Sequence, residues 1–413
     1  MRLTKRAQCA LAGLSAMGTV LVASNASAVD CSSLQNRVYV TGSSAVEPFM
    51  TALGAALYPN GTTIVYQRAG SCIGVTSMVH STPISGTAKY YPAVDDAGLG
   101  VATDCDLGST DAGGGQPVDL GVSDVFPESC PGGAADPTKV GDFWGPNQVM
   151  VFVAPEKANT VKNISAEAAY YVMGQPAGGK TVAPWTDSTK LYIRNAGSGT
   201  QTMLAAAIHL DAASWHGTDA ASAAGVEAKL KDADMNDPAF VSVLGIVSTG
   251  EADRDRDFLK VVGFQDFGQK CAYWPDSSLT SFDKKWVRTG QYPIWGPLHM
   301  LAAVTTAGGD PTNPLVKTIV GYFNGTETPP GNKNLIIDLE IASHTVPQCA
   351  MKVRRTRELG PYSASNDPNP CGCYFDAHIP GGAVPASCKT CTTTDECGDA
   401  GNMICSYGYC EAK

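Results

Sequence analysis

The chain has 413 residues, of which 44% are hydrophobic and 16% are charged, and its formal net charge is −10. This length exceeds what one hydrophobic core usually serves, so it predicts two large lobes with an appendage. The negative charge argues against nucleic acid and anionic membranes as partners. A small anion remains compatible with it, because surface charge is screened beyond roughly 8 Å at physiological salt.

The first residues are typical of a secretion signal. Three cations among the first six residues precede an apolar stretch over residues 7–23, and Ala26-Ser27-Ala28 is a small-residue cleavage site. The apolar stretch is short and contains Gly, Ser and Thr, which disfavours a membrane anchor. We therefore expect residues 1–28 to be a cleaved signal peptide and the remaining chain to be periplasmic or extracellular.

The chain contains 14 cysteines, and an odd number remains once Cys9 of the expected signal peptide is removed. In an exported protein this count predicts disulfides and leaves at least one thiol free or paired outside the chain. Cys72 has no obvious His base in the sequence, so we expect a disulfide there rather than a nucleophile.

Short β-rich runs alternate with helical patterns between Arg37 and Val353, which predicts an α/β chain with largely parallel sheets. The stretches 85–117 and 263–289 are interpreted as insertions or loops. Strands are predicted at residues 37–40, 62–66, 118–121, 149–153, 190–193 and 244–247.

Helices are predicted where apolar residues recur at helical spacing, as they do between Val46 and Leu57 after the first strand. Ser165 is a typical N-cap of a second helix, which residue 174, a glycine, ends. Pro314 suits the first turn of a third helix, which the Asn324-Gly325 pair closes.

The composition changes near the C-terminus. From Gly360 the chain is rich in Ser, Asn, Asp and Pro, and seven cysteines follow between Cys371 and Cys410. We interpret residues 354–370 as a linker and residues 371–413 as a separate Cys-rich module. Disulfides are favoured there over a zinc site, because disulfides stabilise small coreless modules outside the cytosol.

Three strand-to-helix turns share one kind of sequence: Thr41-Gly42-Ser43-Ser44, Ala69-Gly70-Ser71 and Gly197-Ser198-Gly199-Thr200. Glycine lets the backbone approach a ligand, the helix start offers unpaired N–H groups, and the hydroxyls add donors. Each turn alone is compatible with an ordinary helix cap, but three in one chain predict an anion site.

Two charged residues stand near these turns. Arg194 precedes the third turn, and its planar guanidinium suits two oxygens of a tetrahedral anion. Asp124 ends the segment Gly121-Val122-Ser123-Asp124, where a carboxylate repels an anion unless that anion carries a proton to donate. Such an acceptor would select phosphate over sulfate, whereas the alternative is that Asp124 merely caps a helix.

Four segments, in this order, resemble the phosphate-contacting segments of the periplasmic phosphate-binding proteins that feed high-affinity ABC importers. The resemblance covers roughly residues 37–353 and does not reach the Cys-rich module, which we also call the tail. The segments are Val40-Thr41-Gly42-Ser43-Ser44-Ala45-Val46, Tyr66-Gln67 with Gly70-Ser71, Gly121-Val122-Ser123-Asp124, and Arg194 with Gly197-Ser198-Gly199-Thr200.

The resemblance implies a two-lobed type 2 periplasmic-binding-protein fold with two hinge crossovers. Lobe 1 would comprise residues 29–145 with 294–353, and lobe 2 residues 146–293. One inorganic phosphate would be held between them by hydrogen bonds, without a cofactor or metal. The protein would be a monomer that delivers phosphate to the membrane subunits of an ABC importer.

By position, the resemblance assigns ligand contacts to Ser43, Ser44, Ala45, Ser71, Asp124, Arg194, Ser198, Gly199 and Thr200. The sequence departs from the family pattern in three places, and the last of them bears on anion selectivity. Ala45 and Val46 stand where the family usually has a Thr hydroxyl, Glu47 stands where an aromatic residue is common, and Ala196 replaces an Asp that in many members pairs with the arginine.

The sequence contains no motif that favours an enzyme. Its six histidines lack the spacing of a zinc enzyme, and there is no Gly-x-Ser-x-Gly elbow and no phosphate loop ending in Gly-Lys-Ser or Gly-Lys-Thr. The Cys-rich module, which importers do not need, leaves one alternative open. In this alternative, the protein has a solute-binding fold but serves as a cell-surface or extracellular adhesion or matrix component.

Overall fold

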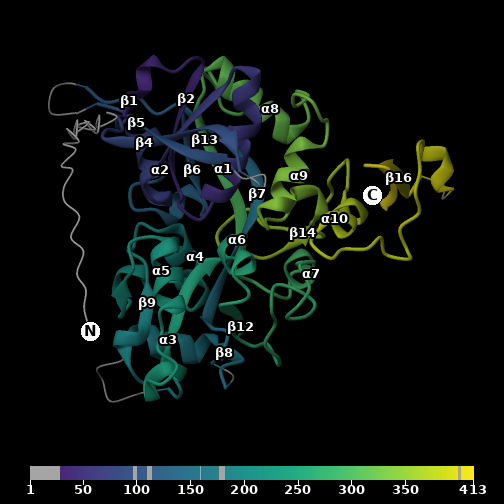
Figure 1. Ribbon diagram of the computed structural model, residues 1–413. Coiled ribbons are helices and arrows are strands. Elements are labelled where there is room, and N and C mark those ends of the chain that lie inside the picture. The colour runs from purple at the N-terminus through teal and green to yellow at the C-terminus, as the bar shows by residue number, and fades with distance from the viewer. Residues whose placement is uncertain (1–27, 96–99, 109–113, 159, 176–181, 399–400) are drawn as a thin grey trace, which may run out of the picture.

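The computed structural model describes residues 28–413 except 96–99, 109–113, 159, 176–181 and 399–400. The predicted signal peptide therefore lies outside the described residues, apart from Ala28. Two lobes are stacked one above the other, and the C-terminal residues project to one side (Figure 1). No helix in the described part of the chain is long and apolar enough to cross a membrane.

Lobe 1 is the purple and blue lobe of Figure 1, and the later helices α8 and α9 pack on it. Its strands are β1 (Val29–Asp30), β2 (Arg37–Gly42), β3 (Thr63–Arg68), β4 (Thr87–Val94), β5 (Gly100–Asp106), β6 (Leu120–Ser123), β13 (Trp295–Ala303) and the first part of β7 (Val140–Pro155). Its helices are α1 (Glu47–Leu57), α2 (Ser71–Val79), α8 (Pro314–Asn324) and α9 (Leu335–Ala342).

Lobe 2 is the teal lobe, built around the second part of β7. Its further strands are β8 (Asn163–Ser165), β9 (Leu191–Ile193), β10 (Thr218–Asp219), β11 (Leu244–Ser248) and β12 (Leu259–Gln265). Its helices are α3 (Ala166–Gly174), α4 (Gly199–Ala207), α5 (Ala223–Lys231), α6 (Thr249–Arg254) and α7 (Lys285–Arg288).

The six predicted strands and three predicted helices are all present, and most of their ends are shifted by a few residues. The exception is the strand predicted at residues 149–153, which is the second part of the much longer β7. Their local signals act as expected. The Ser165 hydroxyl accepts a hydrogen bond from the amide of Ala168 at the start of α3. The Asn313 side chain caps α8, and Gly325 ends that helix with a left-handed φ of 76°.

The sheet is mixed, so the prediction of largely parallel sheets is wrong. Strand β2 pairs in parallel with β3 and β6, but β7 pairs antiparallel with β13, β11 and β12. One reason is that β4 and β5, which lie within the range 85–117 interpreted as an insertion or loop, pair antiparallel with each other, and β4 also pairs antiparallel with β3. The other is that β7 and β13 run in opposite directions beside each other.

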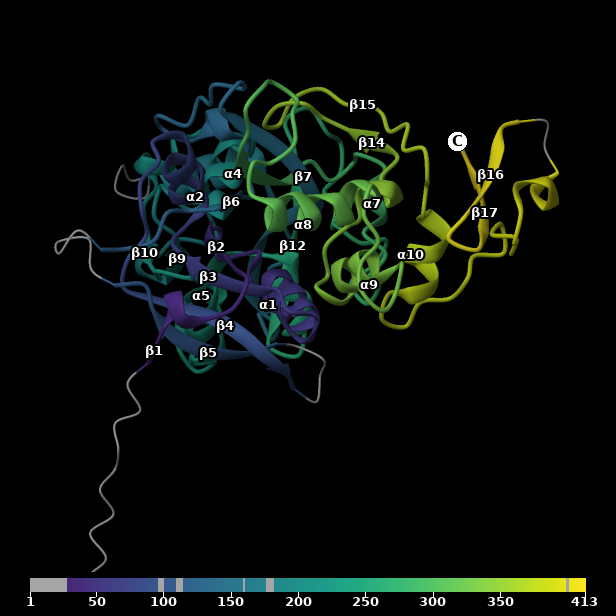
Figure 2. The same ribbon diagram turned by 90° about the horizontal axis from the view of Figure 1, so that it is seen from above.

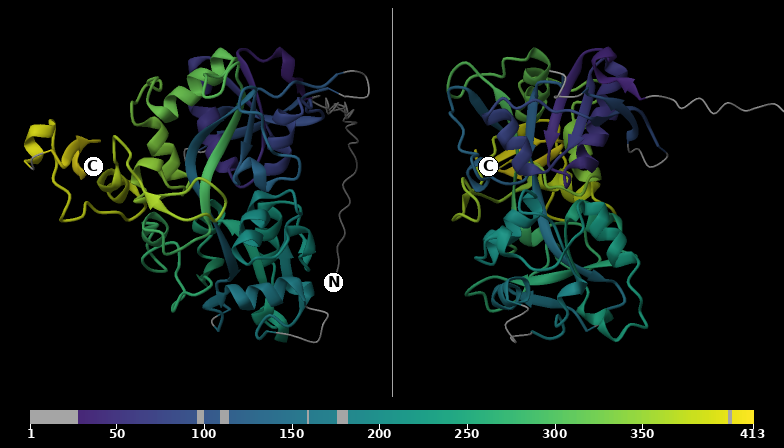
Figure 3. Two further views of the ribbon diagram at one scale, coloured as in Figure 1. Left: turned by 180° about the vertical axis from the view of Figure 1, so that it is seen from behind. Right: turned by 90° about the vertical axis from the view of Figure 1, so that its left-hand side faces the viewer.

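The two lobes share strand β7. Its first part pairs with β13 from Val140 to Val149, and its second part pairs with β11 and β12 from Met150 onward. The return crossover runs beside it, since the Met150 amide donates to the Ile294 carbonyl at 3.0 Å. Figure 3 shows these two crossovers from two sides.

The C-terminal region packs against the lobes more than the predicted linker and separate module would. Arg355, within the expected linker, is 2% exposed, and the expected module begins with Cys371 and Phe375 in the core that extends through lobe 2 and the hinge. The disulfide Cys349–Cys371 and the ion pair between Arg288 and Asp376 fasten helix α10 (Gly372–His378) there. Only the part that carries β16 (Met403–Ser406) and β17 (Tyr409–Ala412) stands away from the lobes (Figure 2).

Twelve of the described cysteines form six disulfides, and Cys271 is free and exposed, as the odd count predicted. Three disulfides cross-link the tail, so its cysteines are engaged with one another rather than available as zinc ligands. The tail disulfides are Cys373–Cys388, Cys391–Cys405 and Cys397–Cys410.

Candidate functional site

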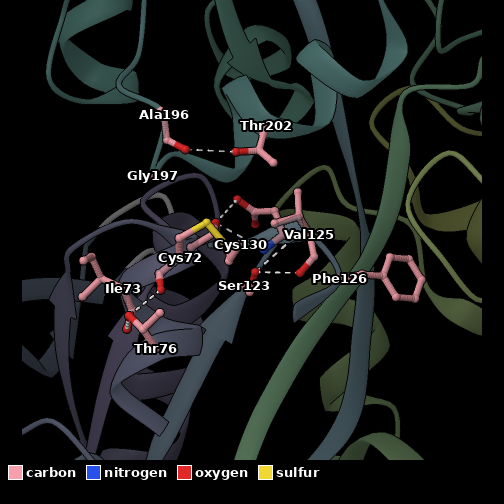
Figure 4. Close-up of a disulfide and its surroundings, with 12 residues drawn as sticks. Cys72, Ile73, Thr76, Ser123, Val125, Phe126, Cys130, Ala196, Gly197 and Thr202 are labelled. Atoms are coloured by element: carbon pink, nitrogen blue, oxygen red, sulfur yellow. Dashed lines mark hydrogen bonds between the residues drawn. A yellow bond between two sulfur atoms is a disulfide. The ribbon is translucent and has the colours of Figure 1, made fainter. Parts of the chain in front are cut away.

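The predicted turns meet where the two lobes touch. Ser71 begins α2 in lobe 1, and Gly199 begins α4 in lobe 2. The Cys72 amide donates to the Gly197 carbonyl across the contact at 3.2 Å. Figure 4 shows the loop of Gly197 from lobe 2 lying against the start of α2, next to the disulfide of Cys72 and Cys130.

Asp124 lies at the end of β6 and is 1% exposed. Its Oδ2 atom accepts hydrogen bonds from the Ser43 hydroxyl and, at 3.1 Å, from the Ser71 hydroxyl. The next helical turn begins only at Pro127, with Phe126 as its N-cap, so Asp124 does not cap a helix. Burial raises the pKa of Asp124 to about 6, although the two serine hydroxyls act to lower that pKa.

Gly199 permits the close contact between the lobes. A β-carbon at this position would lie 2.2 Å from the Ser71 hydroxyl oxygen and 2.9 Å from Asp124 Oδ2. Real β-carbon contacts are essentially never this short. The glycine in the third turn therefore lets the start of α4 reach the serine and carboxylate groups of lobe 1, whereas the sequence predicted a close approach to a ligand.

Arg194 follows β9 and is 4% exposed. Its Nη2 atom donates across the lobes to the Ser44 hydroxyl at 3.1 Å, and within lobe 2 to the Ala221 carbonyl at 3.3 Å. No carboxylate in the described ranges forms an ion pair with it, and Ala196 has no group that would. Burial lowers the pKa of the Arg194 guanidinium, but arginine remains charged in proteins.

Three charged-group atoms at this contact are buried without a hydrogen-bond partner among the described residues. They are Nε and Nη1 of Arg194 and Oδ1 of Asp124. Buried polar groups in proteins are nearly always paired, and an unpaired buried charge costs several kcal/mol. Arg194 donates to Ser44, and the neighbouring Ser43 donates to Asp124, so the orphaned donors and the orphaned acceptor lie beside the same pair of serines.

Helix α4 begins without a side-chain cap, although Ser198 occupies its N-cap position. Elsewhere in lobe 2, the hydroxyls of Ser165, Ser222 and Ser248 each accept a first-turn amide of the helix that they begin. The Ser198 hydroxyl makes no such bond, and Gly70 at the start of α2 has no side chain to make one. The start of α4 therefore presents backbone N–H groups without a side-chain acceptor, an arrangement that attracts anions. At the start of α2, by contrast, the Cys72 and Ile73 amides donate to the carbonyls of Gly197 and Gly70.

The remaining predicted contacts lie at the same contact or beside it. Ser198 and Thr200 are buried at the start of α4, and Ala45 is buried before α1. The Ala45 amide donates to Ser43 Oγ at 3.1 Å, so this amide is engaged. Helix α1 begins only at Glu47, and Glu47 forms an ion pair with Arg68 at 2.8 Å.

Two supporting residues were not identified as site residues from the sequence. The Gln201 side chain accepts the Arg194 backbone amide at 2.8 Å and donates to the Ala212 carbonyl at 2.7 Å, which holds the arginine in place. The Tyr66 hydroxyl donates to the Ser43 carbonyl. No sequence pattern distinguishes Gln201 from any other polar residue in the first turns of a helix. Tyr66, by contrast, belongs to one of the four segments that carry the resemblance.

No family model and no curated protein matches this chain. Among solved structures, an ABC-type phosphate transport receptor from Vibrio cholerae is 13% identical, covers 75% of this chain and 99% of its own, and has a TM-score of 0.43. PstS from Borrelia burgdorferi is 11% identical, with coverages of 76% and 99% and a TM-score of 0.37. A third match is the reduced OxyR regulatory domain from Pseudomonas aeruginosa, which is 6% identical, with coverages of 70% and 96% and a TM-score of 0.36.

The similar structures thus include phosphate-transport proteins and a regulatory domain. A fold of this kind does not by itself determine what is bound. The chemistry of the site comes from its own groups, which are serine hydroxyls, helix-start amides, one guanidinium and one carboxylate, arranged where two lobes of an α/β fold meet.

Proposed function

We propose that this protein is an extracytoplasmic solute-binding protein that captures phosphate between its two lobes and delivers it to the membrane subunits of an ABC importer. It would bind its ligand by hydrogen bonds and would not transform it. The six disulfides support an oxidising location outside the cytosol.

The observation that carries this proposal is the set of unpartnered buried atoms on Arg194 and Asp124. A tetrahedral oxyanion supplies acceptors for the guanidinium Nε and Nη1 atoms. If one of its oxygens is protonated, that oxygen supplies a donor for Asp124 Oδ1. One ligand of this chemistry therefore satisfies both groups and also offsets the charge of the guanidinium, which a neutral ligand would not do and a cation would oppose.

The same groups favour phosphate over sulfate. Hydrogen phosphate keeps a proton near neutral pH, while sulfate has none to give to a carboxylate. A carboxylate that faces an unprotonated anion opposes it by like-charge repulsion, which costs several kcal/mol at a desolvated site. Asp124 is thus the residue that would discriminate between the two anions.

Binding requires the serine hydroxyls to change partners. Ser43 and Ser71 donate to Asp124 in the described structure, and Arg194 donates to Ser44. We expect the lobes to open about the β7 and β13 crossovers, admit the anion, and close with these hydroxyls turned toward it.

Titration calorimetry of the mature protein with phosphate, sulfate, arsenate and molybdate tests the proposal. Phosphate and arsenate should bind, and sulfate and molybdate should bind much more weakly. A matched control for long-range charge is Arg254→Ala, which removes a cation of lobe 2 that is 40% exposed and paired with Glu227. Absence of both heat and thermal stabilisation with every anion would contradict the proposal and favour the adhesion or matrix role.

A further inference from the structure

The chain crosses the hinge a third time after α9. We call residues 344–362 the hinge strap. Val346 and Asn147 of β7 exchange two backbone hydrogen bonds, at 2.8 and 3.1 Å, where β7 passes between the lobes. The Thr249 hydroxyl of lobe 2 donates to the His344 carbonyl at 3.1 Å. The strap is therefore fastened to the hinge strand and to lobe 2.

Arg355 fixes the middle of the strap to the return crossover. Its guanidinium packs against the rings of both Trp295 and Tyr362, 4.3 and 4.7 Å from their centroids, and these rings are parallel to within 2°. Its Nη2 atom donates to the Pro293 carbonyl at 2.9 Å and to the Tyr362 hydroxyl at 2.6 Å. The stacking and hydrogen bonds of this buried cation leave the strap little freedom to move along the hinge.

The strap then reaches the loop that presents Asp124. Glu358 Oε2 accepts the Phe126 amide at 3.2 Å, across 232 residues of sequence. Phe126 is 6% exposed, so its amide has no ready access to water as a substitute partner. A β-carbon on Gly296 would lie 3.4 Å from the Asp124 carbonyl oxygen and 4.0 Å from Glu358 Oε1, so both groups lie against the same residue of β13.

The Asp124 loop also contacts two serines of lobe 1. Asp124 accepts the hydroxyls of Ser43 and Ser71, and its own amide donates to Ser71 Oγ at 3.3 Å. These are the hydroxyls that anion binding would draw away. The Glu358 contact does not involve any group assigned to the anion, so it persists when those hydroxyls change partners.

We propose that Glu358 is a positioning residue for the anion site, a proposal that rests on the proposed function. By accepting the Phe126 amide, Glu358 fixes the backbone that orients the Asp124 carboxylate. The C-terminal strap is thereby part of the binding device. Removing the Glu358 carboxyl leaves the Phe126 amide buried and unpaired, which loosens the loop.

Glu358→Ala, Glu358→Gln and Glu128→Ala test this role. Glutamine keeps an oxygen that accepts the Phe126 amide. Glu128 is an exposed residue on the same loop, so its replacement removes a carboxyl group there without that contact. Phosphate and sulfate affinities are measured by calorimetry, and amide hydrogen exchange is followed over residues 121–130.

We expect Glu358→Ala to weaken phosphate binding about tenfold, which corresponds to the 1–1.5 kcal/mol of one hydrogen bond. It should also narrow the preference for phosphate over sulfate and speed exchange at Phe126. Glu358→Gln should retain most of the affinity, and Glu128→Ala should behave as the parent. A narrowed preference would not follow from a general loss of stability.

If the parent binds phosphate and Glu358→Ala binds it equally well with unchanged selectivity, the positioning role is wrong and the proposed function stands. If the parent binds no oxyanion, the proposed function fails. Independently of binding, an unchanged rate of amide exchange at Phe126 in Glu358→Ala would overturn the claim that this carboxyl holds the loop.

Discussion

Gly199 of lobe 2 and Ser71 of lobe 1 approach each other so closely that even a methyl group on Gly199 would overlap the serine hydroxyl. The two residues begin α4 and α2, so this approach brings two helix starts together at one point. The same contact therefore joins the two lobes and brings the start of each helix to the candidate site.

Gly199→Ala should weaken phosphate binding at least tenfold while leaving the fold intact. Alanine is favourable within a helix, but its β-carbon would hold the lobes apart at Ser71. Calorimetry measures the affinity, and circular dichroism checks the helix content. Gly263→Ala in lobe 2 is the control, because its β-carbon would make only ordinary contacts of 3.4 Å with Trp274. Parent-like binding by Gly199→Ala would show that this contact is not needed in the bound state.

Arg194→Ala should abolish most phosphate affinity. The variant removes the cation whose buried Nε and Nη1 atoms await an acceptor, and losing one partner of a buried charge pair costs about 3–5 kcal/mol. The dissociation constant should therefore rise by at least about a hundredfold in calorimetry. Arg254→Ala, the exposed arginine of the same lobe, should change it little. Equal losses in the two variants would indicate a general charge effect.

Asp124→Asn should relax discrimination against sulfate. The amide no longer repels an unprotonated oxygen and offers it a donor. The ratio of the sulfate and phosphate dissociation constants, measured at one pH, should move toward one. Undiminished rejection of sulfate by this variant would rule out Asp124 as the acceptor of the phosphate proton.

The stability of the unliganded protein should report the burial of Asp124. Its pKa is raised from 3.8 to about 6, so this group favours folding while it is protonated. The stabilisation from the protonated carboxyl is complete below pH 3.8 and is lost as the pH rises through about 6. The loss in the free energy of unfolding amounts to about 3 kcal/mol. Urea unfolding at several pH values should show the free energy of unfolding of the parent falling relative to that of Asp124→Asn over this range. A constant difference would contradict the burial, and Glu128→Gln serves as the exposed control.

The disulfide of Cys72 and Cys130 should support the site. It ties the residue after Ser71 to the loop that follows Asp124. Replacing both cysteines by serine should lower the free energy of unfolding by about 2–4 kcal/mol and weaken phosphate binding. The same replacement of Cys397 and Cys410 in the distal tail should leave phosphate affinity unchanged. If affinity falls equally in both double variants, the site does not depend specifically on the first disulfide.

The sequence alone determined the local framework of the site. Gly70 and Gly199 permit close backbone approach, Ser198 and Ser71 begin helices, and Arg194 follows a strand. These features follow from conformational preferences and capping, which act within a few residues of chain. The resemblance then ordered them into one ligand site, and the odd cysteine count indicated an unpaired thiol.

Only the tertiary structure decided which groups meet and which are left unpaired. The bonds from Ser43 to Asp124, from Arg194 to Ser44 and from Phe126 to Glu358 join residues 81, 150 and 232 positions apart. Local preference does not specify such pairs, because they depend on how whole lobes pack and which atoms lose water in the process. For the same reason the sequence indicated a linker at residues 354–370, whereas packing made Arg355 part of the hinge and brought Glu358 to the loop of Asp124.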